Sequence, residues 1–552
     1  MKRFSSFERA AVIDRLKTHY YDLVVIGGGI TGAGIALDAA SRGLKTALVE
    51  KNDFASGTSS RSTKLIHGGL RYLKQFEIAL VREVGMERAI VHKLAPHLVV
   101  SEKMLLPIIE GGTFGKLLTS FGLMVYDVLA GVEKEDQRKM LSKEETLAIE
   151  PLLPEKILKG AGLYAEYRTD DARLTIEVLK TAAKYESDAI NYMKASDFTY
   201  KHERVTGIVA EDMLSGENFN IQSKYVVSAA GPWVDDLRNI NHSKKGKRLH
   251  LTKGVHIVLP HHKFPVKYSL YFDVPDGRMV FAIPRGKITY VGTTDTNYPG
   301  NKDHVVPHTE DAQYLIDAIN HMFPDIHVEI NDIVSSWAGV RPLIHEDGKS
   351  ASELSRKDEI FESSTGLISI AGGKLTGYRK MAQRVVDMVA EKHEEEYGKT
   401  FKKCLTDKIV LSGGVFENTA DVNAYIVHVL ERIKTFGLDL HDATYLVSNY
   451  GRQTDKVLEK FLELKDNDAL LRLTKAELWF TLNHEMVHRP QDFIIRRTGR
   501  LYFKIENLKA LVDPVIDEFA NYFNWDAIQK QQERDQINIA IFEACNFKPE
   551  NS

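Results

Sequence analysis

The chain has 552 residues, of which 43% are hydrophobic and 27% charged, and its formal net charge is −3. This composition is typical of a globular protein of about two or three domains, and the balanced charge argues against a dedicated nucleic-acid binder. Two cysteines, Cys404 and Cys545, supply neither a disulfide framework nor a cysteine metal site, so we expect no metal and a reducing, cytoplasmic setting.

The first twenty residues predict a short amphipathic helix. Phe4, Phe7, Ala11 and Leu16 recur at roughly helical spacing. We expect this helix to pack on the domain that follows, the alternative being a helix that lies on a membrane surface. No run of the sequence reaches the ~18 to 20 apolar residues that span a bilayer.

Residues 21–50 predict a buried strand, a glycine turn, a helix and a second strand that ends in an acid. Gly27, Gly29 and Gly32 fill the positions of a G-x-G-x-x-G motif, in which the glycines allow a tight turn, close approach to a pyrophosphate and helix–sheet packing. Glu50 is placed to accept hydrogen bonds from ribose hydroxyls. The predicted dinucleotide contacts in this unit are Gly27, Gly28, Gly29, Thr31, Gly32, Glu50 and Lys51.

Hydroxyl, glycine and cationic residues crowd the next segment, residues 57–72. Flavoproteins place such a segment after the ribose acid, where it wraps the pyrophosphate and reaches the isoalloxazine, whereas nicotinamide dehydrogenases usually do not. A plain surface loop is the alternative. The predicted flavin contacts here are Ser59, Ser60, Lys64, Leu65, Ile66, His67, Gly68 and Gly69.

Two later segments predict strands that return to the same domain. Residues 224–233 form a short apolar strand that runs into a Gly-Pro turn, and residues 366–374 form a strand that runs into a glycine turn before a helix over 378–394. Ligands of doubly wound sheets collect at such carboxyl ends of strands. The contacts predicted from these turns are Gly231, Trp233, Gly373, Lys374, Leu375 and Thr376, with a core tryptophan as the alternative for Trp233.

A second domain and a helical third one are predicted from the remaining patterns. Short β-rich runs separated by turn signals favour an antiparallel sheet, and they cover residues 251–259, 268–274, 278–283 and 287–292. Beyond residue 405 the patterns are helical, with examples at 421–435, 455–464 and 513–523. We expect the last of these to open with Asp513 as its cap and Pro514 at its first position.

Seven motifs in order carry a family resemblance: GGGITGAG, SSRSTKLIHGGLRYL, KGVHIV (253–258), TDT (294–296), AGVRPL (338–343), AGGKLTGYRKMA (371–382) and DFIIRRT (492–498). With them the chain resembles the FAD-dependent glycerol-3-phosphate dehydrogenases, in particular the bacterial, quinone-linked aerobic enzymes. The resemblance implies FAD as cofactor, oxidation of sn-glycerol 3-phosphate to dihydroxyacetone phosphate, and a membrane quinone as acceptor. It also implies peripheral contact with the cytoplasmic face of the membrane; an oligomer is compatible with the sequence.

The fold that we expect is α/β plus α, in three parts. They are a discontinuous FAD-binding Rossmann-like domain of the glutathione-reductase and D-amino-acid-oxidase type (1–95, 200–243 and 360–400), an antiparallel-sheet substrate domain (96–199 and 244–359) and a C-terminal helical domain (405–552). The twin arginines of DFIIRRT are candidates for joining the helical domain to the active-site side, the alternative being a charged helix face.

A phosphate dianion requires several cationic donors, and arginine suits it because its planar fork binds two oxygens at once. The substrate-binding residues that the resemblance suggests are Arg71, Tyr72, Arg341, Arg356 and Lys374. A solvent-exposed ion pair is the alternative for Arg356, and packing is the alternative for Tyr72.

The chemical step removes a hydride from the carbinol carbon and a proton from its hydroxyl group. Flavin N5 takes the hydride, and a histidine suits the proton because its pKa lies near working pH. His256 and His67 are the first candidates and His345 is the third. Because a guanidinium stays protonated, we expect Arg341 to stabilise the developing alkoxide and to bind phosphate.

Three other functions remain open at this stage. A glycerol-3-phosphate oxidase would use the same site and pass electrons to O₂ to give hydrogen peroxide. An amino-acid oxidase of the same superfamily would need a clamp for a carboxylate instead of a phosphate. A non-catalytic FAD- or tRNA-binding protein would leave the flavin oxidised when glycerol phosphate is added.

Overall fold

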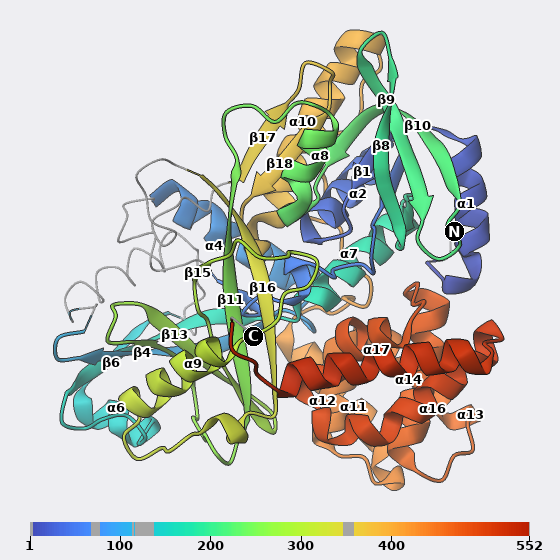
Figure 1. Ribbon diagram of the computed structural model, residues 1–552. Coiled ribbons are helices and arrows are strands. Elements are labelled where there is room, and N and C mark those ends of the chain that lie inside the picture. The colour runs from blue at the N-terminus through green and yellow to red at the C-terminus, as the bar shows by residue number, and fades with distance from the viewer. Residues whose placement is uncertain (1–3, 68–77, 113–114, 116–136, 346–357, 551–552) are drawn as a thin grey trace.

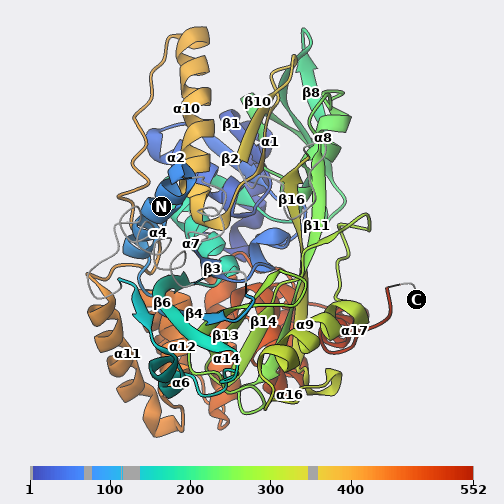
Figure 2. The same ribbon diagram turned by 90° about the vertical axis from the view of Figure 1, so that its left-hand side faces the viewer.

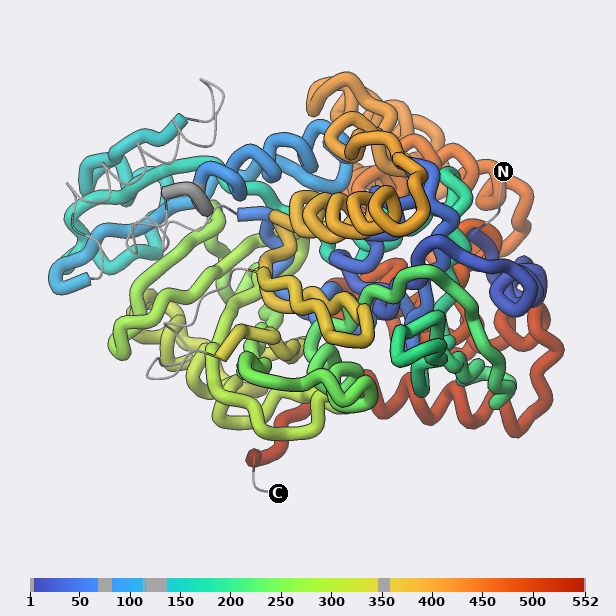
Figure 3. The backbone as a smooth tube through the Cα atoms, turned by 90° about the horizontal axis from the view of Figure 1, so that it is seen from above, coloured from blue at the N-terminus to red at the C-terminus, as the bar shows by residue number. Residues whose placement is uncertain are grey.

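Two β-sheets and a group of C-terminal helices make up the molecule (Figure 1). The computed structural model describes residues 4–67, 78–112, 115, 137–345 and 358–550. Figure 2 shows the first sheet and helix α10 above the second sheet. Seen from above, the second sheet lies on one side and the orange and red C-terminal helices on the other (Figure 3).

The first sheet has a parallel centre, in the order β17-β18-β10-β1-β2-β7. Its strands are β1 (Tyr20–Ile26), β2 (Thr46–Val49), β7 (Asp188–Ile190), β10 (Asn218–Ser228), β17 (Asp358–Glu362) and β18 (Ile368–Gly372). Ile26 lies beside Ser228, and Ser228 lies beside Ser369. Because these strands run in parallel, the three glycine turns that follow β1, β10 and β18 meet at one edge of the sheet.

Helices cover this sheet, and a β-meander extends it. Helix α2 lies between α7 and α10, and strands β8 and β9 join the sheet through antiparallel pairing with β10. Their bounds are α2 (Ile30–Arg42), α7 (Asp171–Lys184), α10 (Tyr378–Tyr397), α8 (Val234–Ile240), β8 (Met193–Lys201) and β9 (Arg204–Asp212). Helix α1 (Arg9–Thr18) packs on the same domain through Val12 and Leu16, as predicted.

Two predicted domain limits differ from the structure. We expect residues 171–199 in the substrate domain, but β7 and most of β8 belong to the first sheet and α7 packs on α2 of the first domain. Conversely β3 (Leu65–Ile66), expected in the dinucleotide domain, pairs with β6 of the second sheet. β3 and β7, with two and three residues, are too short to leave a periodic signal, whereas α7 and β8 are longer but their patterns do not indicate which sheet they join.

The second sheet is largely antiparallel, with the order β15-β11-β14-β13-β12-β4-β6-β3 and with β16 paired to β11 and β5 paired to β6. All four predicted β-rich runs are strands of this sheet. Its bounds are β4 (Val100–Ile109), β5 (Lys139–Leu141), β6 (Leu158–Arg168), β11 (Leu249–Pro260), β12 (Ser269–Asp273), β13 (Met279–Arg285), β14 (Ile288–Gly292), β15 (Thr296–Asn297) and β16 (Ser335–Ile344). Helices α6 (Lys143–Ile149) and α9 (Thr309–Met322) pack on this sheet, whereas α4 (Ile78–Leu94) places Val91 and Leu94 in the core of the first domain.

The C-terminal part is helical, as expected. Its helices are α11 (Thr419–Ile433), α12 (Leu440–Tyr450), α13 (Thr454–Glu463), α14 (Ala469–His484), α15 (Arg500–Phe503), α16 (Ile505–Phe523) and α17 (Ala527–Cys545). The predicted helix start at Asp513 is wrong, because α16 begins at Ile505 and Pro514 lies inside it. The buried stripe that includes Leu508, Leu511 and Phe519 holds the helix together across the proline.

Contacts with the domains of both sheets hold the C-terminal helices in place. Trp337 and Tyr290 of the second sheet share a core with Tyr502 and Phe519. On the first domain, Asp53 accepts hydrogen bonds from Arg497 at 2.8 and 2.9 Å and from Arg496 at 2.5 Å, all buried. The twin arginines therefore join the helical domain to the segment that follows Glu50. Among the described residues, none of the helices combines the length and the apolar character needed to cross a bilayer.

Candidate functional site

A pocket of about 690 Å³ lies where the two sheets meet. Its walls come from the turns after β1, β2, β10 and β18 of the first sheet and from β13 and β16 of the second. This volume is in the range of ligand-binding pockets. The carboxyl ends of the parallel strands therefore face residues of the second domain across one cavity.

The glycine turn after β1 has no room for side chains. A Cβ on Gly32 would lie 1.9 Å from the carbonyl oxygen of Gly27, whose own φ is +115°. Gly29 starts α2 without a side-chain cap, and Ser59 Oγ accepts a hydrogen bond from the N–H of Ile30 at 3.0 Å. The first turn of α2 thus faces the pocket with backbone N–H groups, an arrangement that suits a pyrophosphate. Thr31 lines the pocket, whereas Gly32 lies behind the turn.

Glu50 is held at the pocket wall by the backbone. Its carboxylate accepts hydrogen bonds from the N–H groups of Gly28 at 2.7 Å and Asn52 at 2.9 Å. Burial raises the pKa of the Glu50 carboxyl group, although these two donors oppose the shift. A Cβ on Gly28 would strike Phe54 and the Glu50 side chain, so this glycine supports the acid from behind. Each carboxylate oxygen keeps a lone pair with which to accept from a ribose hydroxyl.

Lys51 and Trp233 form the next part of the wall. Lys51 Nζ lies 4.2 Å from the centre of the Trp233 ring, and Gly231 turns the chain into this segment with a φ of +53°. Gly57 passes close to the same ring, because a Cβ there would lie 3.1 Å from it. The core-tryptophan alternative is therefore not what the structure contains: Trp233 lines the pocket.

The loop over residues 57–67 reaches the pocket with only part of the predicted set. Ser59, Leu65 and His67 line it, whereas Ser60, Lys64 and Ile66 are buried and do not. Lys64 turns away because its Nζ lies 2.5 Å from Asp171 and 3.8 Å from Asp170. Burial opposes a charge on Lys64, but the two carboxylates outweigh it and raise the pKa of the ammonium group. A contact of the Lys64 side chain with cofactor is thus not supported.

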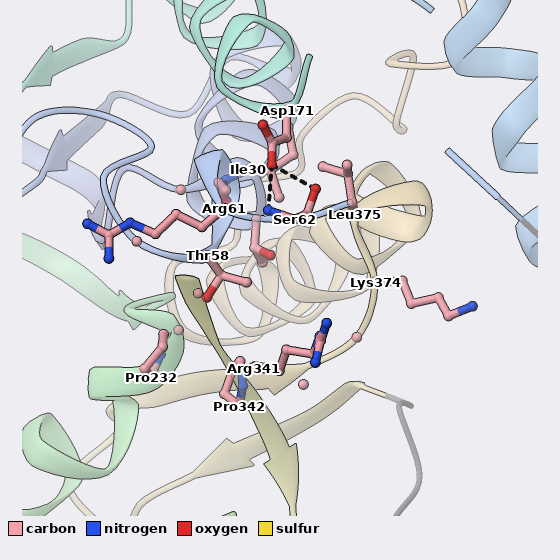
Figure 4. Close-up of a pocket in the computed structure, with 18 of the residues that line it drawn as sticks. Ile30, Thr58, Arg61, Ser62, Asp171, Pro232, Arg341, Pro342, Lys374 and Leu375 are labelled. Atoms are coloured by element: carbon pink, nitrogen blue, oxygen red, sulfur yellow. Dashed lines mark hydrogen bonds between the residues drawn. The ribbon is translucent and has the colours of Figure 1, made fainter. Parts of the chain in front are cut away.

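Asp171, which the sequence analysis did not identify, anchors this loop. Its carboxylate accepts hydrogen bonds from the Ser62 N–H at 3.0 Å and from Ser62 Oγ at 2.7 Å (Figure 4). Thr58 Oγ1 donates to the carbonyl of Val340 at 2.6 Å, and Trp337 Nε1 donates to that of Ser62 at 3.2 Å. In sequence, Asp171 is simply an acid in the first turn of a helix, so no pattern there indicates this role.

Arg341 presents a guanidinium group from β16. It donates to Thr293 Oγ1 at 2.8 Å, to the carbonyl of Thr294 at 3.2 Å and to Asp295 at 3.2 Å. The guanidinium lies against Gly254, where a Cβ would approach within 2.3 Å. These contacts orient a cation at the wall of the pocket, and the TDT motif supplies two of them.

A second cation enters from the turn after β18. Gly372 and Gly373 adopt φ values of +78° and +79°, and they bring Lys374, Leu375 and Thr376 to the pocket wall. In Figure 4 the Lys374 side chain points away from Arg341. The two cations therefore do not meet in the described structure.

The three candidate histidines occupy different environments. His67 lines the pocket, and its ring centre lies 5.9 Å from that of Phe281 in an edge-to-face arrangement. His256 is fully buried: its Nε2 contacts Thr63 Oγ1 at 3.0 Å and its ring stacks on Trp337 at 4.8 Å, so Thr63 separates it from the cavity. Burial, with the nearby charges of Arg341 and Lys64, lowers the pKa of His256 well below its ordinary value.

Some predicted site residues remain without a structural assignment. His345 is described and does not line the pocket. Five other predicted residues lie outside the described residues: Gly68, Gly69, Arg71, Tyr72 and Arg356.

The described residues fit FAD. A glycine turn that a Cβ would fill, backbone N–H groups in the first turn of α2 and a backbone-held acid after β2 suit the pyrophosphate and ribose of the cofactor. The loop over 57–67 then continues along the cavity towards the second domain. Arg341 of β16 lies on the wall that the second domain contributes.

Comparison with known proteins agrees with this geometry. Residues 22–379 match the family model described as FAD dependent oxidoreductase, and residues 404–530 match the C-terminal domain of alpha-glycerophosphate oxidase. The chain is 51% identical over 543 residues to "Aerobic glycerol-3-phosphate dehydrogenase" of Staphylococcus aureus (strain USA300), which covers 98% of both chains.

Solved structures show the same fold. The glycerol-3-phosphate dehydrogenase from Bacillus halodurans, solved in complex with FAD, is 42% identical, with a TM-score of 0.84 and coverage of 98% of this chain and 99% of that one. Glycine oxidase from Geobacillus kaustophilus is 22% identical, with a TM-score of 0.51 over 68% of this chain and 95% of that one, so its similarity concerns the fold alone.

Proposed function

This chain belongs to the FAD-dependent oxidoreductase family that includes the aerobic glycerol-3-phosphate dehydrogenases, and from this premise we propose that it oxidises sn-glycerol 3-phosphate to dihydroxyacetone phosphate. The observation that carries the proposal is the oriented guanidinium of Arg341 in a pocket that also holds the dinucleotide turn. When bound, FAD supplies the hydride acceptor.

Arg341 binds and polarises the substrate. Its guanidinium stays protonated, so it attracts the phosphate and stabilises negative charge on the substrate oxygen as the hydroxyl proton leaves. Asp295 and the carbonyl of Thr294 hold the planar group in place, which limits the reorganisation needed during reaction. Lys374 adds a second positive charge on the opposite wall, and Arg71, Tyr72 and Arg356 are proposed to complete the phosphate site.

His67 is the proposed proton acceptor. It lines the cavity, whereas His256 reaches the cavity only through the hydroxyl group of Thr63. A neutral imidazole at His67 can take the hydroxyl proton directly. The neutral His256 ring then serves to orient the hydroxyl group of Thr63 from the side that faces away from the cavity.

Replacing His67 with glutamine is expected to lower kcat about a hundred-fold while FAD stays bound, because general-base assistance is lost. His256→Gln should lower kcat less, since it acts through Thr63. Steady-state rates with an artificial acceptor, together with the flavin content of each variant, measure both effects. A larger loss of kcat in His256→Gln than in His67→Gln would reverse the assignment.

One anaerobic experiment tests the reaction itself. Adding sn-glycerol 3-phosphate to the yellow holoprotein is expected to bleach the flavin absorbance near about 450 nm. Glycine and proline, as substrates of the amino-acid oxidase alternative, should leave the band unchanged. A band that persists at saturating sn-glycerol 3-phosphate would contradict the proposed function and favour a non-catalytic binding protein.

For the electron acceptor we propose a membrane quinone, reached by peripheral contact of a cytoplasmic protein with the inner face of the membrane. An apolar quinone resides in the bilayer, so a protein that reduces it must approach that surface. The oxidase is the second candidate, favoured by the match of residues 404–530 to the C-terminal domain of alpha-glycerophosphate oxidase. Hydrogen peroxide formation compared with quinone reduction by the purified protein separates the two.

A further inference from the structure

A short segment of the second domain crosses from the substrate side of the pocket to the dinucleotide side. We call residues 298–304 the strap. It begins where the Tyr298 N–H donates to the carbonyl of Leu251 at 2.9 Å, and it is followed by Val305, which is buried in the second domain's core. Asp295, shortly before it, holds Arg341. The strap is therefore anchored at both ends to the domain that carries the substrate guanidinium.

Asp303 connects the strap to the dinucleotide wall. Its carboxylate forms an ion pair with Lys51 Nζ and accepts a hydrogen bond from Trp233 Nε1 at 3.0 Å. Both donors line the pocket, and Lys51 directly follows Glu50. One carboxylate of the second domain thus holds two side chains that come from separate turns of the first domain.

The neighbours of Asp303 reinforce this crossing. Lys302 Nζ lies 2.7 Å from Asp236 and 3.4 Å from the carbonyl oxygen of Pro232, both on the pocket wall. On the other side, His304 Nε2 lies 2.8 Å from Glu543 of α17. Three consecutive strap residues therefore contact the first domain and the C-terminal helices.

We propose that the strap retains the FAD cofactor at the dinucleotide end of the pocket, with Asp303 as the residue that fastens it. An exposed ion pair alone contributes little, and the Asp303 side chain is 56% exposed. Asp303, however, joins two side chains of the pocket wall, Lys51 and Trp233, to the second domain, so we expect its contacts to act on the rate at which this wall opens and FAD is released. The inference rests on the proposed function only through the bound FAD.

The test measures FAD release from the holoprotein, followed as the increase in free-flavin fluorescence after dilution. Asp303→Asn is expected to release FAD about five-fold faster than the wild type, because the charge that holds Lys51 is removed. Asp325→Asn, an exposed aspartate of the same domain that does not line the pocket, should release at the wild-type rate. Asp303→Glu keeps the carboxylate and should restore slow release.

Salt provides an independent readout. Screening weakens an exposed ion pair, so raising the ionic strength should accelerate release from the wild type more than from Asp303→Asn. Equal release rates for these two proteins, or equal acceleration by salt in both, would overturn the proposal, whereas Asp325→Asn should respond to salt as the wild type does. The release assay contains no substrate, so its outcome is independent of the reduction experiment. A flavin that the protein retains but that sn-glycerol 3-phosphate never reduces would contradict the proposed function and leave the role of the strap intact.

Discussion

Replacing Arg341 with leucine is expected to lower kcat/KM for sn-glycerol 3-phosphate about a thousand-fold. The variant loses both the attraction for the phosphate and the stabilisation of the developing alkoxide, and removing one such preorganised donor usually costs about a hundred- to a thousand-fold by itself. KM should rise and kcat should fall, because both binding and chemistry use the guanidinium. Initial rates over a range of substrate concentrations separate the two parameters.

Two controls define this prediction. Arg341→Lys keeps the charge but cannot form the same planar set of contacts with Thr293, Thr294 and Asp295, so it should lie between the wild type and Arg341→Leu. Arg452→Gln removes an arginine that pairs with Asp421 in the helical domain and should leave kcat/KM unchanged. A wild-type kcat/KM in Arg341→Leu with full FAD content would exclude Arg341 from the substrate site.

Asp53→Ala is expected to lower the free energy of unfolding by about 3–5 kcal/mol. The substitution leaves the buried guanidinium groups of Arg496 and Arg497 without their shared carboxylate, and breaking one side of a buried ion pair costs an amount of this order. Denaturant unfolding of the holoprotein measures the change. The matched control is Asp513→Ala, which breaks the exposed pair with Arg534 and should cost less than about 1 kcal/mol.

The carboxylate of Asp53 also makes the stability of the protein depend on pH, with stability lost at acid pH. Burial alone would raise the pKa of Asp53, but Arg497 and Arg496 outweigh burial and lower it far below its ordinary value. Its contribution to stability is therefore complete above the unfolded-state pKa of about 3.9 and is lost as pH falls towards the lower folded-state value. The wild type should lose more stability than Asp53→Ala over that acid range, and parallel losses would contradict this account.

The sequence predicted the parts of the site that depend on local chemistry. The glycine pattern around Gly27 and Gly32 indicates a tight turn in which a side chain has no room. The strands that end near Gly231 and Gly373 are each followed directly in sequence by the glycine that makes the turn. The four β-rich runs of the second sheet are likewise separated by turn signals in the sequence. These features could be predicted because each residue is constrained by its own neighbours along the chain.

The rest depends on partners that are distant in sequence. Lys64 is a residue type that often binds anions, yet its charge is neutralised by Asp171, which lies 107 residues later in the sequence. The burial of His256 follows from its stacking on Trp337 of the neighbouring strand β16, which no spacing within KGVHIV indicates. Pro514 mimics a helix start because the buried stripe on both sides of it becomes visible only in three dimensions.

The junction between Asp53 and Arg497 also has a consequence for biosynthesis. The two residues are 444 positions apart, so the ribosome has made nearly the whole polypeptide before the carboxylate meets its guanidinium. Until then the nascent nucleotide-binding unit carries an aspartate whose interior position has no cation to balance it. We therefore expect the amino-terminal portion to reach its final packing only after the carboxyl-terminal one emerges, and a chain truncated near residue 400 would keep the glycine motif but lack both arginines that pair with Asp53.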